Sequence, residues 1–527
     1  MNMILKDFNL NKKDIYFLII ILVFNLILTS YYINFNINLG IYCSDVYVYL
    51  LNALYFTGTH IDSANTIYLS PVICYLTSIL IRLGITSQLS ILIVTAAFSI
   101  IGNIGLYLLF KTRFSSMLSL CGSILYSTFA INLTWLANGT LDIPAVSILI
   151  LIMLFTIISI QTNPKYFTLV SPLFVIGIFT RYTVILIFPV LVLYYLYYKG
   201  FSIDRTDLKY ILIGIIFGIL IAGAIYLQIT RLSNGYFGAN SQITGGINGH
   251  KGSSTDLAFN TDTSYYLVNF INFISASKVT FANRTPILET PTINSIAILL
   301  ILIEGSILFF KKHDFQIKEN ILPIVILLVA LLSFNHISSF ITILMTFLGL
   351  LLLGKENKNK TGIVMLSWIL VHFIFFSYYN IKVNRYIIPT IPPFIYLILS
   401  GIDLIHENFN FNKNIIPLAL IILFVIQGFT FCMAFETTSE FKAPQDMSEY
   451  IIQEIPDYDS QKIGVYNMRP YHWYLGKNIT GIESNDTTKI QHGNISYYIS
   501  DIHYNNLTNF NEIKNIDNLY LYKRSIK

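Results

Sequence analysis

The chain has 527 residues, of which 54% are hydrophobic and only 12% are charged, and its mean hydropathy is +0.63. Soluble domains carry about 25% charged residues, so this composition excludes a soluble globule and indicates an integral membrane protein. The formal net charge is +5, but the Lys and Arg residues are spread between apolar segments and form no stripe that could follow a phosphate backbone. Nucleic acid is therefore not expected as a partner.

Apolar segments that are long enough, or nearly long enough, to cross a bilayer recur along the chain. A helix needs about 20 predominantly apolar residues for this. The first segment has no small-residue cleavage site after it, so it is expected to remain as an anchor. The sequence predicts a polytopic α-helical membrane protein with about thirteen transmembrane helices, at residues 15–33, 88–110, 116–135, 142–160, 167–179, 183–198, 209–227, 291–310, 321–333, 336–353, 361–379, 386–405 and 415–433.

The positions of Lys and Arg predict the orientation of these helices. If the N-terminus is cytoplasmic, the inside loops carry sixteen of these cations and the outside segments before residue 435 carry eight. Cytoplasmic loops are enriched in Lys and Arg, which favours this orientation. An odd number of spans then places the C-terminal segment on the outer side of the plasma membrane.

Two of the loops that fall outside in this topology are long enough to describe separately. The first outer loop, 35–70, is followed by an apolar run at 71–83 that is too short to span and is expected at the membrane interface. The second is a long outer loop at 229–290. Its part from 235 to 252 is rich in Gly, Asn and Ser, and we expect it to be mobile.

The tail at 435–527 is the third outer region, and its charge is higher and its hydrophobicity lower than in the transmembrane domain at 1–434. A helix pattern at 444–455 and short β-rich runs, at 462–466, 495–500 and 519–522, predict a small soluble α/β domain. Four neighbouring side chains in this tail could contact carbohydrate or form the domain core: Tyr471, His472, Trp473 and Tyr474.

One carboxylate in the first outer loop, that of Asp45, is a candidate catalytic group. Ser44 can cap a helix that carries Asp45 in its first turn and ends at Gly58. Most residues of this helix are apolar or aromatic, so we expect it to lie on the membrane surface with Asp45 turned toward a cavity. Asp45 could act as a general base, or it could simply complement the positive end of the helix.

Several segments, in this order, resemble the GT-C class of membrane glycosyltransferases, in particular the protein O-mannosyltransferases and the aminoarabinose transferases. They are Ser44 to Gly58, Leu69 to Leu76, Gly139 to Pro144, Phe179 to Thr183, and Asn384 to Pro389 with Pro392 and Pro393 after it. The resemblance covers nearly the whole chain. It implies a GT-C-like fold, a catalytic acid in the first outer loop and a polyprenyl-phosphate sugar donor.

The resemblance has one departure. Many relatives carry two adjacent acids in the first outer loop, whereas Val46 follows Asp45 in this chain. A divalent metal ion is therefore not indicated, and no other cofactor is expected, although the sequence leaves metal dependence open.

Cations at the outer ends of two predicted spans are candidates for holding the lipid-linked phosphate. Arg181 and Arg385 can each bind a phosphate bidentately, and Lys382 could assist. The alternative is that these side chains extend from helix ends toward lipid headgroups.

Asp142 begins a predicted span at the outer face. It could hold an acceptor or a metal ion, or it could serve only as a first-turn charge. His60, Asp62 and His336 also face outward, but their spacing matches no metal motif, which favours solvated positions in loops.

The sequence thus predicts an inverting glycosyltransferase that takes a sugar from a polyprenyl-phosphate donor in the membrane lipid. The acceptor would be a hydroxyl on a protein, a glycan or a lipid at the outer face. Two alternatives stay open: a non-enzymatic transporter of lipid or polysaccharide, and a polymerase or ligase of lipid-linked glycans. The hypotheses differ in whether Asp45, Asp142, Arg181 and Arg385 converge.

Overall fold

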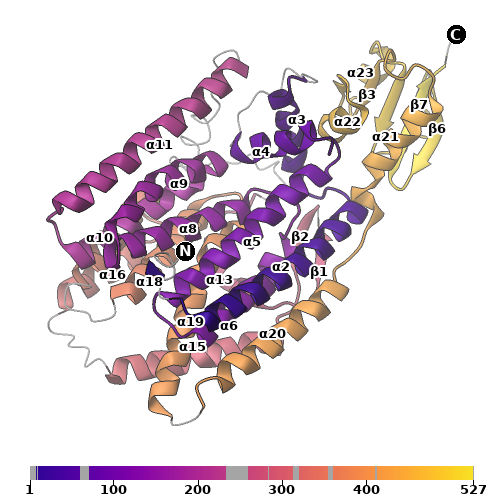
Figure 1. Cartoon of the computed structure of the whole chain (residues 1–527). Coiled ribbons are helices and arrows are strands. Elements are labelled where there is room, and N and C mark those ends of the chain that lie inside the picture. The colour runs from indigo at the N-terminus through magenta and orange to yellow at the C-terminus, as the bar shows by residue number, and fades with distance from the viewer. Residues whose placement is uncertain are drawn as a thin grey trace.

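The computed structural model of the chain is a bundle of long helices with a small sheet domain at one end (Figure 1). The structure describes residues 7–8, 10–59, 71–232, 259–282, 284–312, 320–353, 360–409 and 412–525. The expected mobile stretch at 235–252 and the residues His60 and Asp62 lie outside these described residues.

The helices of the bundle follow the apolar segments of the sequence. The α-helices are α2 (Lys12–Leu39), α3 (Asp45–Thr57), α4 (Pro71–Arg82), α5 (Leu89–Lys111), α6 (Ser116–Thr128), α7 (Ala130–Thr134), α8 (Asp142–Gln161), α9 (Phe167–Thr180), α10 (Phe188–Lys199), α11 (Arg205–Leu232), α13 (Tyr265–Val268), α14 (Phe270–Ile274), α15 (Ile293–Lys312), α16 (Ile321–Leu332), α17 (Ser339–Leu353), α18 (Lys360–Tyr378), α19 (Ile391–Asn408) and α20 (Ile415–Met433). Four short 3₁₀ helices accompany them: η1 (Pro164–Tyr166), η2 (Tyr182–Ile187), η3 (Asn384–Thr390) and η4 (Ser439–Phe441).

All thirteen segments that the sequence predicts to span are helical, but they differ in length. Among the described residues, nine helices are long and apolar enough to cross a membrane. The segments predicted at 116–135, 167–179, 321–333 and 336–353 form shorter helices. The polytopic helical fold is therefore confirmed, and length and composition support nine spans.

The surface of the bundle is apolar where an acyl chain would contact it. Large hydrophobic side chains are exposed along α2, α11, α15, α16 and α20, whereas α8 is buried almost throughout. Exposed apolar surface on this scale is not found on monomeric soluble proteins. The chain is an integral membrane protein whose core is organised around α8.

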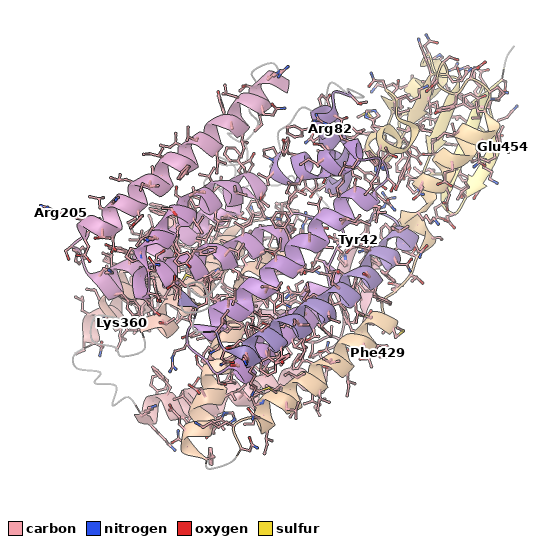
Figure 2. All side chains as sticks on the ribbon, in the orientation of Figure 1. Tyr42, Arg82, Arg205, Lys360, Phe429 and Glu454 are labelled. Carbon is pink, nitrogen blue, oxygen red and sulfur yellow. The ribbon has the colours of Figure 1, made fainter. Side chains whose placement is uncertain are left out.

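The sheet domain lies at one end of the bundle, and the start of α18 lies at the other (Figures 1 and 2). Figure 2 shows Lys360, at the start of α18, far from Glu454 in the sheet domain, at opposite ends of the molecule. This separation agrees with the predicted inner and outer sides. The orientation itself stays a prediction.

The sheet domain contains three helices and a mixed five-stranded sheet. Its elements are α21 (Ala443–Glu454), β3 (Ile463–Val465), α22 (Met468–Leu475), β4 (Thr480–Gly481), α23 (Thr487–His492), β5 (Tyr497–Ser500), β6 (Phe510–Ile516) and β7 (Leu519–Arg524). The strand order is β4-β3-β5-β7-β6, with β3 parallel to β4 and β5, and β7 antiparallel to β5 and β6. The predicted helix and the three predicted strands are all present, whereas the sequence did not predict α22, α23, β4 or β6.

A β-hairpin connects this domain to the bundle. It consists of β1 (Val279–Ala282) and β2 (Thr285–Leu288), which follow α14 in the second outer loop. Val279 also forms a bridge with Phe435, the first aromatic residue after α20. The hairpin therefore holds the start of the C-terminal segment against the outer-loop residues.

Candidate active site

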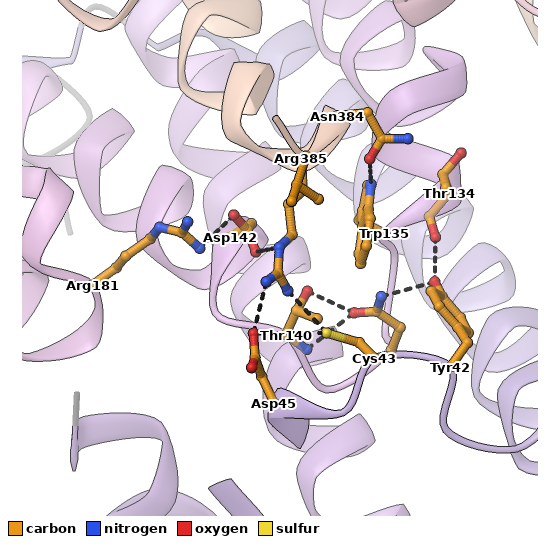
Figure 3. Close-up of polar contacts among 12 residues, drawn as sticks. Tyr42, Cys43, Asp45, Thr134, Trp135, Thr140, Asp142, Arg181, Asn384 and Arg385 are labelled. Carbon is orange, nitrogen blue, oxygen red and sulfur yellow. Dashed lines mark hydrogen bonds and ion pairs between the residues drawn. The ribbon is translucent and has the colours of Figure 1, made fainter. Parts of the chain in front are cut away.

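Asp45 lies at the first position of α3 and contacts a guanidinium that comes from the other end of the sequence (Figure 3). Arg385, on η3, donates a hydrogen bond from Nη2 to Asp45 Oδ2 at 2.7 Å, and its Nη1 donates to Cys43 Sγ at 3.1 Å. The α3 helix forms as predicted and ends at Gly58 in the left-handed conformation. Ser44 precedes α3 in a helical conformation and its side chain makes no capping hydrogen bond, so that part of the prediction is wrong.

Asp142, at the start of α8, joins the two arginines. Its Oδ1 forms an ion pair with Arg181 Nη1 at 2.5 Å, and its Oδ2 lies 3.6 Å from Arg385 Nε. The Asp142 side chain is 2% exposed and that of Arg385 is 9% exposed, whereas that of Asp45 is 38% exposed. We call these four residues (Asp45, Asp142, Arg181 and Arg385) the Asp/Arg cluster. Asp45 is the most accessible member of the cluster. The other three side chains are less exposed, and Asp142 contacts both arginines.

Aromatic rings hold the two guanidinium groups in place. The Arg385 guanidinium lies over the Trp135 ring, 5.3 Å from its centroid, and the Arg181 guanidinium lies 5.0 Å from the centroid of Tyr386. Trp135 is itself fixed, because its Nε1 donates to Asn384 Oδ1 at 2.8 Å. Cation–π contacts restrict where a guanidinium can point, so the protein's own side chains orient both arginines.

The loop between α7 and α8 brings Asp142 close to α3. Gly139 has a φ of +87°, and a Cβ at this position would lie 2.7 Å from Val46 Cγ1, next to Asp45. The Asn138 amide donates to the Tyr42 hydroxyl at 2.8 Å, and that hydroxyl donates to the Thr134 carbonyl at 2.6 Å. The loop can approach α3 this closely only because residue 139 has no side chain.

Charge and burial act in opposite directions on Asp45. Burial raises its pKa, but the Arg385 guanidinium, assisted by Arg469 and Arg181, outweighs burial and holds the pKa of the Asp45 carboxyl below its usual value. Burial also raises the pKa of the Cys43 thiol to about 11. Near neutral pH the cluster therefore contains an ionised Asp45 beside a neutral thiol.

The structure does not bring Lys382 into the Asp/Arg cluster. Its ammonium group donates hydrogen bonds to the carbonyls of Phe376 at 3.0 Å, Ser377 at 2.7 Å and Tyr379 at 2.5 Å. These carbonyls lie at the C-terminal end of α18, where a cation satisfies acceptors that the helix leaves open. Its contacts are those of a helix cap.

Three residues that the sequence did not single out also belong to the cluster's surroundings: Cys43, Trp135 and Tyr386. Cys43 and Tyr386 are the near neighbours of Asp45 and Arg385 in the chain, so their closeness was a usable signal. No sequence signal pointed to Trp135, because 250 residues separate it from Arg385 in the chain. In the part of the chain that the structure describes, no three His, Cys, Asp or Glu side chains gather as metal ligands do.

Comparison with known proteins gives a partial sequence match and matches over the whole fold. The family described as dolichyl-phosphate-mannose-protein mannosyltransferase matches residues 69–232. No curated protein sequence matches this chain significantly.

Solved structures extend this likeness to nearly the whole chain. ArnT from Cupriavidus metallidurans, solved bound to undecaprenyl phosphate, aligns with a TM-score of 0.58 and 10% identity, covering 96% of this chain and 97% of its own. Its apo state aligns with a TM-score of 0.57 and 11% identity, covering 91% of this chain and 92% of its own.

The oligosaccharyltransferase of Archaeoglobus fulgidus, solved with a tethered acceptor peptide, has a TM-score of 0.50 and 12% identity. The alignment covers 92% of this chain and 69% of that one. With identities this low, these alignments establish a shared fold and nothing more. The chain therefore has the fold of the GT-C membrane glycosyltransferases, and it resembles the protein mannosyltransferase family over residues 69–232.

Proposed function

We propose that this protein is an inverting glycosyltransferase that moves a sugar from a polyprenyl-phosphate donor to an acceptor hydroxyl at the outer face of the membrane. The observation that carries the proposal is the convergence of Asp45, Asp142, Arg181 and Arg385 from four separate segments of the chain. A transporter has no need to hold an accessible carboxylate against two oriented guanidinium groups. ArnT, which shares the fold, was solved with undecaprenyl phosphate, and this supports a lipid-linked donor here.

Asp45 is the proposed general base. An inverting transfer needs a carboxylate that takes the proton of the acceptor hydroxyl while its oxygen forms a bond to the anomeric carbon. The bond between that carbon and the phosphate oxygen breaks at the same time, and its electron pair leaves with the polyprenyl phosphate. Asp45 suits the role because it is ionised and is the most exposed member of the cluster.

Arg385 is proposed to couple donor binding to the activation of Asp45. Its guanidinium is shared between Asp45, Cys43 and Asp142. A donor phosphate would compete with Asp45 for the same N–H groups, because guanidinium groups bind phosphate bidentately. When Arg385 turns to the phosphate, Asp45 loses its strongest cationic partner, so its pKa rises and it becomes a better base.

Asp142 and Arg181 have supporting roles in this proposal. The buried Asp142 carboxylate holds Arg181 and Arg385 at a fixed separation, and Arg181 has further donors with which to reach a phosphate. Electrostatic stabilisation of a leaving group depends on cations that need no reorganisation during the reaction.

Transfer from radiolabelled polyprenyl-phosphate sugars in membranes tests this proposal. We expect Asp45→Asn to lower the transfer rate by at least about 10²-fold, the usual contribution of a general base. Asp262→Asn is the matched control, since Asp262 lies in the second outer loop and its contacts to Ser264 can be kept by an amide oxygen. Equal rates for Asp45→Asn and wild type would remove Asp45 from the base role, and no transfer by wild type from any polyprenyl-phosphate sugar would overturn the function.

A further inference from the structure

The C-terminal domain is docked directly against the helix that carries Asp45. The Tyr474 ring, on α22, makes an edge-to-face contact with Tyr47 on α3 at 5.8 Å between centroids. The Tyr474 hydroxyl donates to Gln88 Oε1 at 3.0 Å, and Trp473 packs against the apolar cluster that contains Val46. These contacts fix the position of α22 relative to the Asp/Arg cluster.

This docking places an arginine of the domain beside the active site. Arg469, in the first turn of α22, is half-buried, and its Nη1 donates to Ser44 Oγ at 3.5 Å. Ser44 immediately precedes Asp45 in the chain. Among the residues that the structure describes, no carboxylate lies within 4 Å of the Arg469 guanidinium. Most of its N–H donors therefore remain available to a ligand.

The charge of the Asp/Arg cluster shows what such a ligand would be. Its two carboxylates and two guanidinium groups sum to zero when all are ionised, so the cluster alone has no excess charge for an anion. A phosphodiester donor carries one negative charge, and the polyprenyl phosphate left after transfer carries about −1.5 to −2 at pH 7. With Arg469 included, the site has the excess positive charge that this phosphate requires.

We propose that Arg469 is a substrate-binding residue and that the C-terminal domain supplies it to the phosphate of the polyprenyl carrier. This inference rests on the proposed function. As Asp45 takes the acceptor proton, Arg385 and Arg469 both lose a negative neighbour while the phosphate gains negative charge. Both guanidinium groups can then stabilise the leaving phosphate. The domain is part of the active site, and its removal costs donor affinity.

Binding of undecaprenyl phosphate to the full-length protein in lipid nanodiscs tests this inference. We expect Arg469→Gln to raise the dissociation constant about tenfold, a change typical of one lost charge-assisted contact. Arg469→Lys keeps the charge but loses bidentate binding, so its dissociation constant should lie between those of wild type and Arg469→Gln. Lys523→Gln removes a positive charge from an exposed position of the same domain and should leave the constant unchanged.

Two further measurements separate the outcomes. Hydrogen exchange of α3 should be the same in Arg469→Gln and wild type, which shows that α22 remains docked. If Arg385→Gln weakens binding while Arg469→Gln does not, Arg469 is only a surface arginine beside Ser44, and the proposed function stands without it. If wild type itself does not bind undecaprenyl phosphate, the proposed function fails together with this inference.

Discussion

Arg385 is the residue on which the Asp/Arg cluster depends most, because it contacts both carboxylates. Its Nη2 bonds to Asp45, its Nε faces Asp142, and its guanidinium lies over the Trp135 ring. A planar group with several donors is needed to reach two carboxylates at once. A point charge on a flexible stem cannot reproduce this geometry.

Replacing Arg385 by Lys tests the requirement for a planar cation. We expect Arg385→Lys to lower the transfer rate by about 10²-fold although the formal charge is kept, because a lysine cannot bridge Asp45 and Asp142. Transfer assays in membranes measure this loss. Arg284→Lys, on the exposed β1–β2 turn, is the control and should keep the wild-type rate. A rate for Arg385→Lys near that of wild type would show that charge alone is sufficient.

The Asp45 carboxyl should make stability depend on pH in a defined direction. Its pKa in the folded protein lies below the usual value of about 3.9, because the Arg385 guanidinium favours the ionised form. The ion pair therefore stabilises the fold at pH values above that usual value, and this stabilisation is lost as the pH falls through the lower folded-state pKa. Thermal unfolding of wild type and Asp45→Asn from pH 6 to pH 3 should give a stability difference that shrinks toward acid pH. A difference that stays constant over this range would show that the pair contributes nothing through ionisation.

At the scale of elements, close helix packing sets the position of the Arg385 segment. η3 continues directly into α19, and α19 crosses α15 where Gly401 faces Gly305. A Cβ at Gly305 would lie 2.6 Å from Gly401 Cα, so the two backbones are in contact. Small residues permit this approach between membrane helices. The crossing therefore helps to determine where Arg385 lies.

A methyl group at this crossing should separate the helices. We expect Gly305→Ala to destabilise the protein by about 1–3 kcal/mol, because the neighbouring atoms are backbone and cannot move aside as a side chain can. Transfer activity should fall with it as η3 shifts. Gly223→Ala in α11 is the matched control, since no atom lies within 4 Å of the added carbon. Thermal unfolding in detergent measures both variants, and equal melting temperatures would show that the crossing can relax.

At the scale of the whole molecule, the sheet domain and the bundle act as one unit. The domain core is separate from that of the bundle. Tyr471 is buried within the domain core, and the Nε2 atom of His472 accepts a hydrogen bond from the backbone N–H of Ile479. Trp473 and Tyr474 point instead toward α3 and α5. The predicted aromatic group thus divides between the domain core and the interface with the bundle.

Loosening this interface should reduce activity without unfolding either part. Tyr474→Ala removes the aromatic contact to Tyr47 and the hydrogen bond to Gln88, which together contribute about 1–3 kcal/mol. We expect faster hydrogen exchange in α3 and α22 and slower transfer, with exchange of β5 and β7 unchanged. Ile452→Ala, at an exposed position on α21, should change neither. Normal transfer by Tyr474→Ala, despite faster exchange in α3, would show that docking is not needed for catalysis.

Features that depend on local composition could be predicted from the amino-acid sequence. Apolar runs of spanning or nearly spanning length are visible in the sequence itself, so the thirteen helical segments could be recognised one by one. The isolated Asp45 could be noticed because the residues after it form an apolar helix pattern that ends at Gly58. The helix and three strands of the tail followed from their own periodicity in the same way.

How these parts combine could not be predicted, because it depends on contacts between distant segments. Asp45 and Arg385 are separated by 340 residues, and nothing in the local pattern of either segment specifies the other. The same holds for the sharing of Asp142 between two arginines and for the docking of α22 on α3. Lys382, three residues before Arg385, instead donates hydrogen bonds to the carbonyls at the end of α18. A buried cation needs such acceptors nearby, because burying it without them is costly. Local periodicity fixes each helix separately, whereas contacts between distant residues depend on how all of the helices pack together.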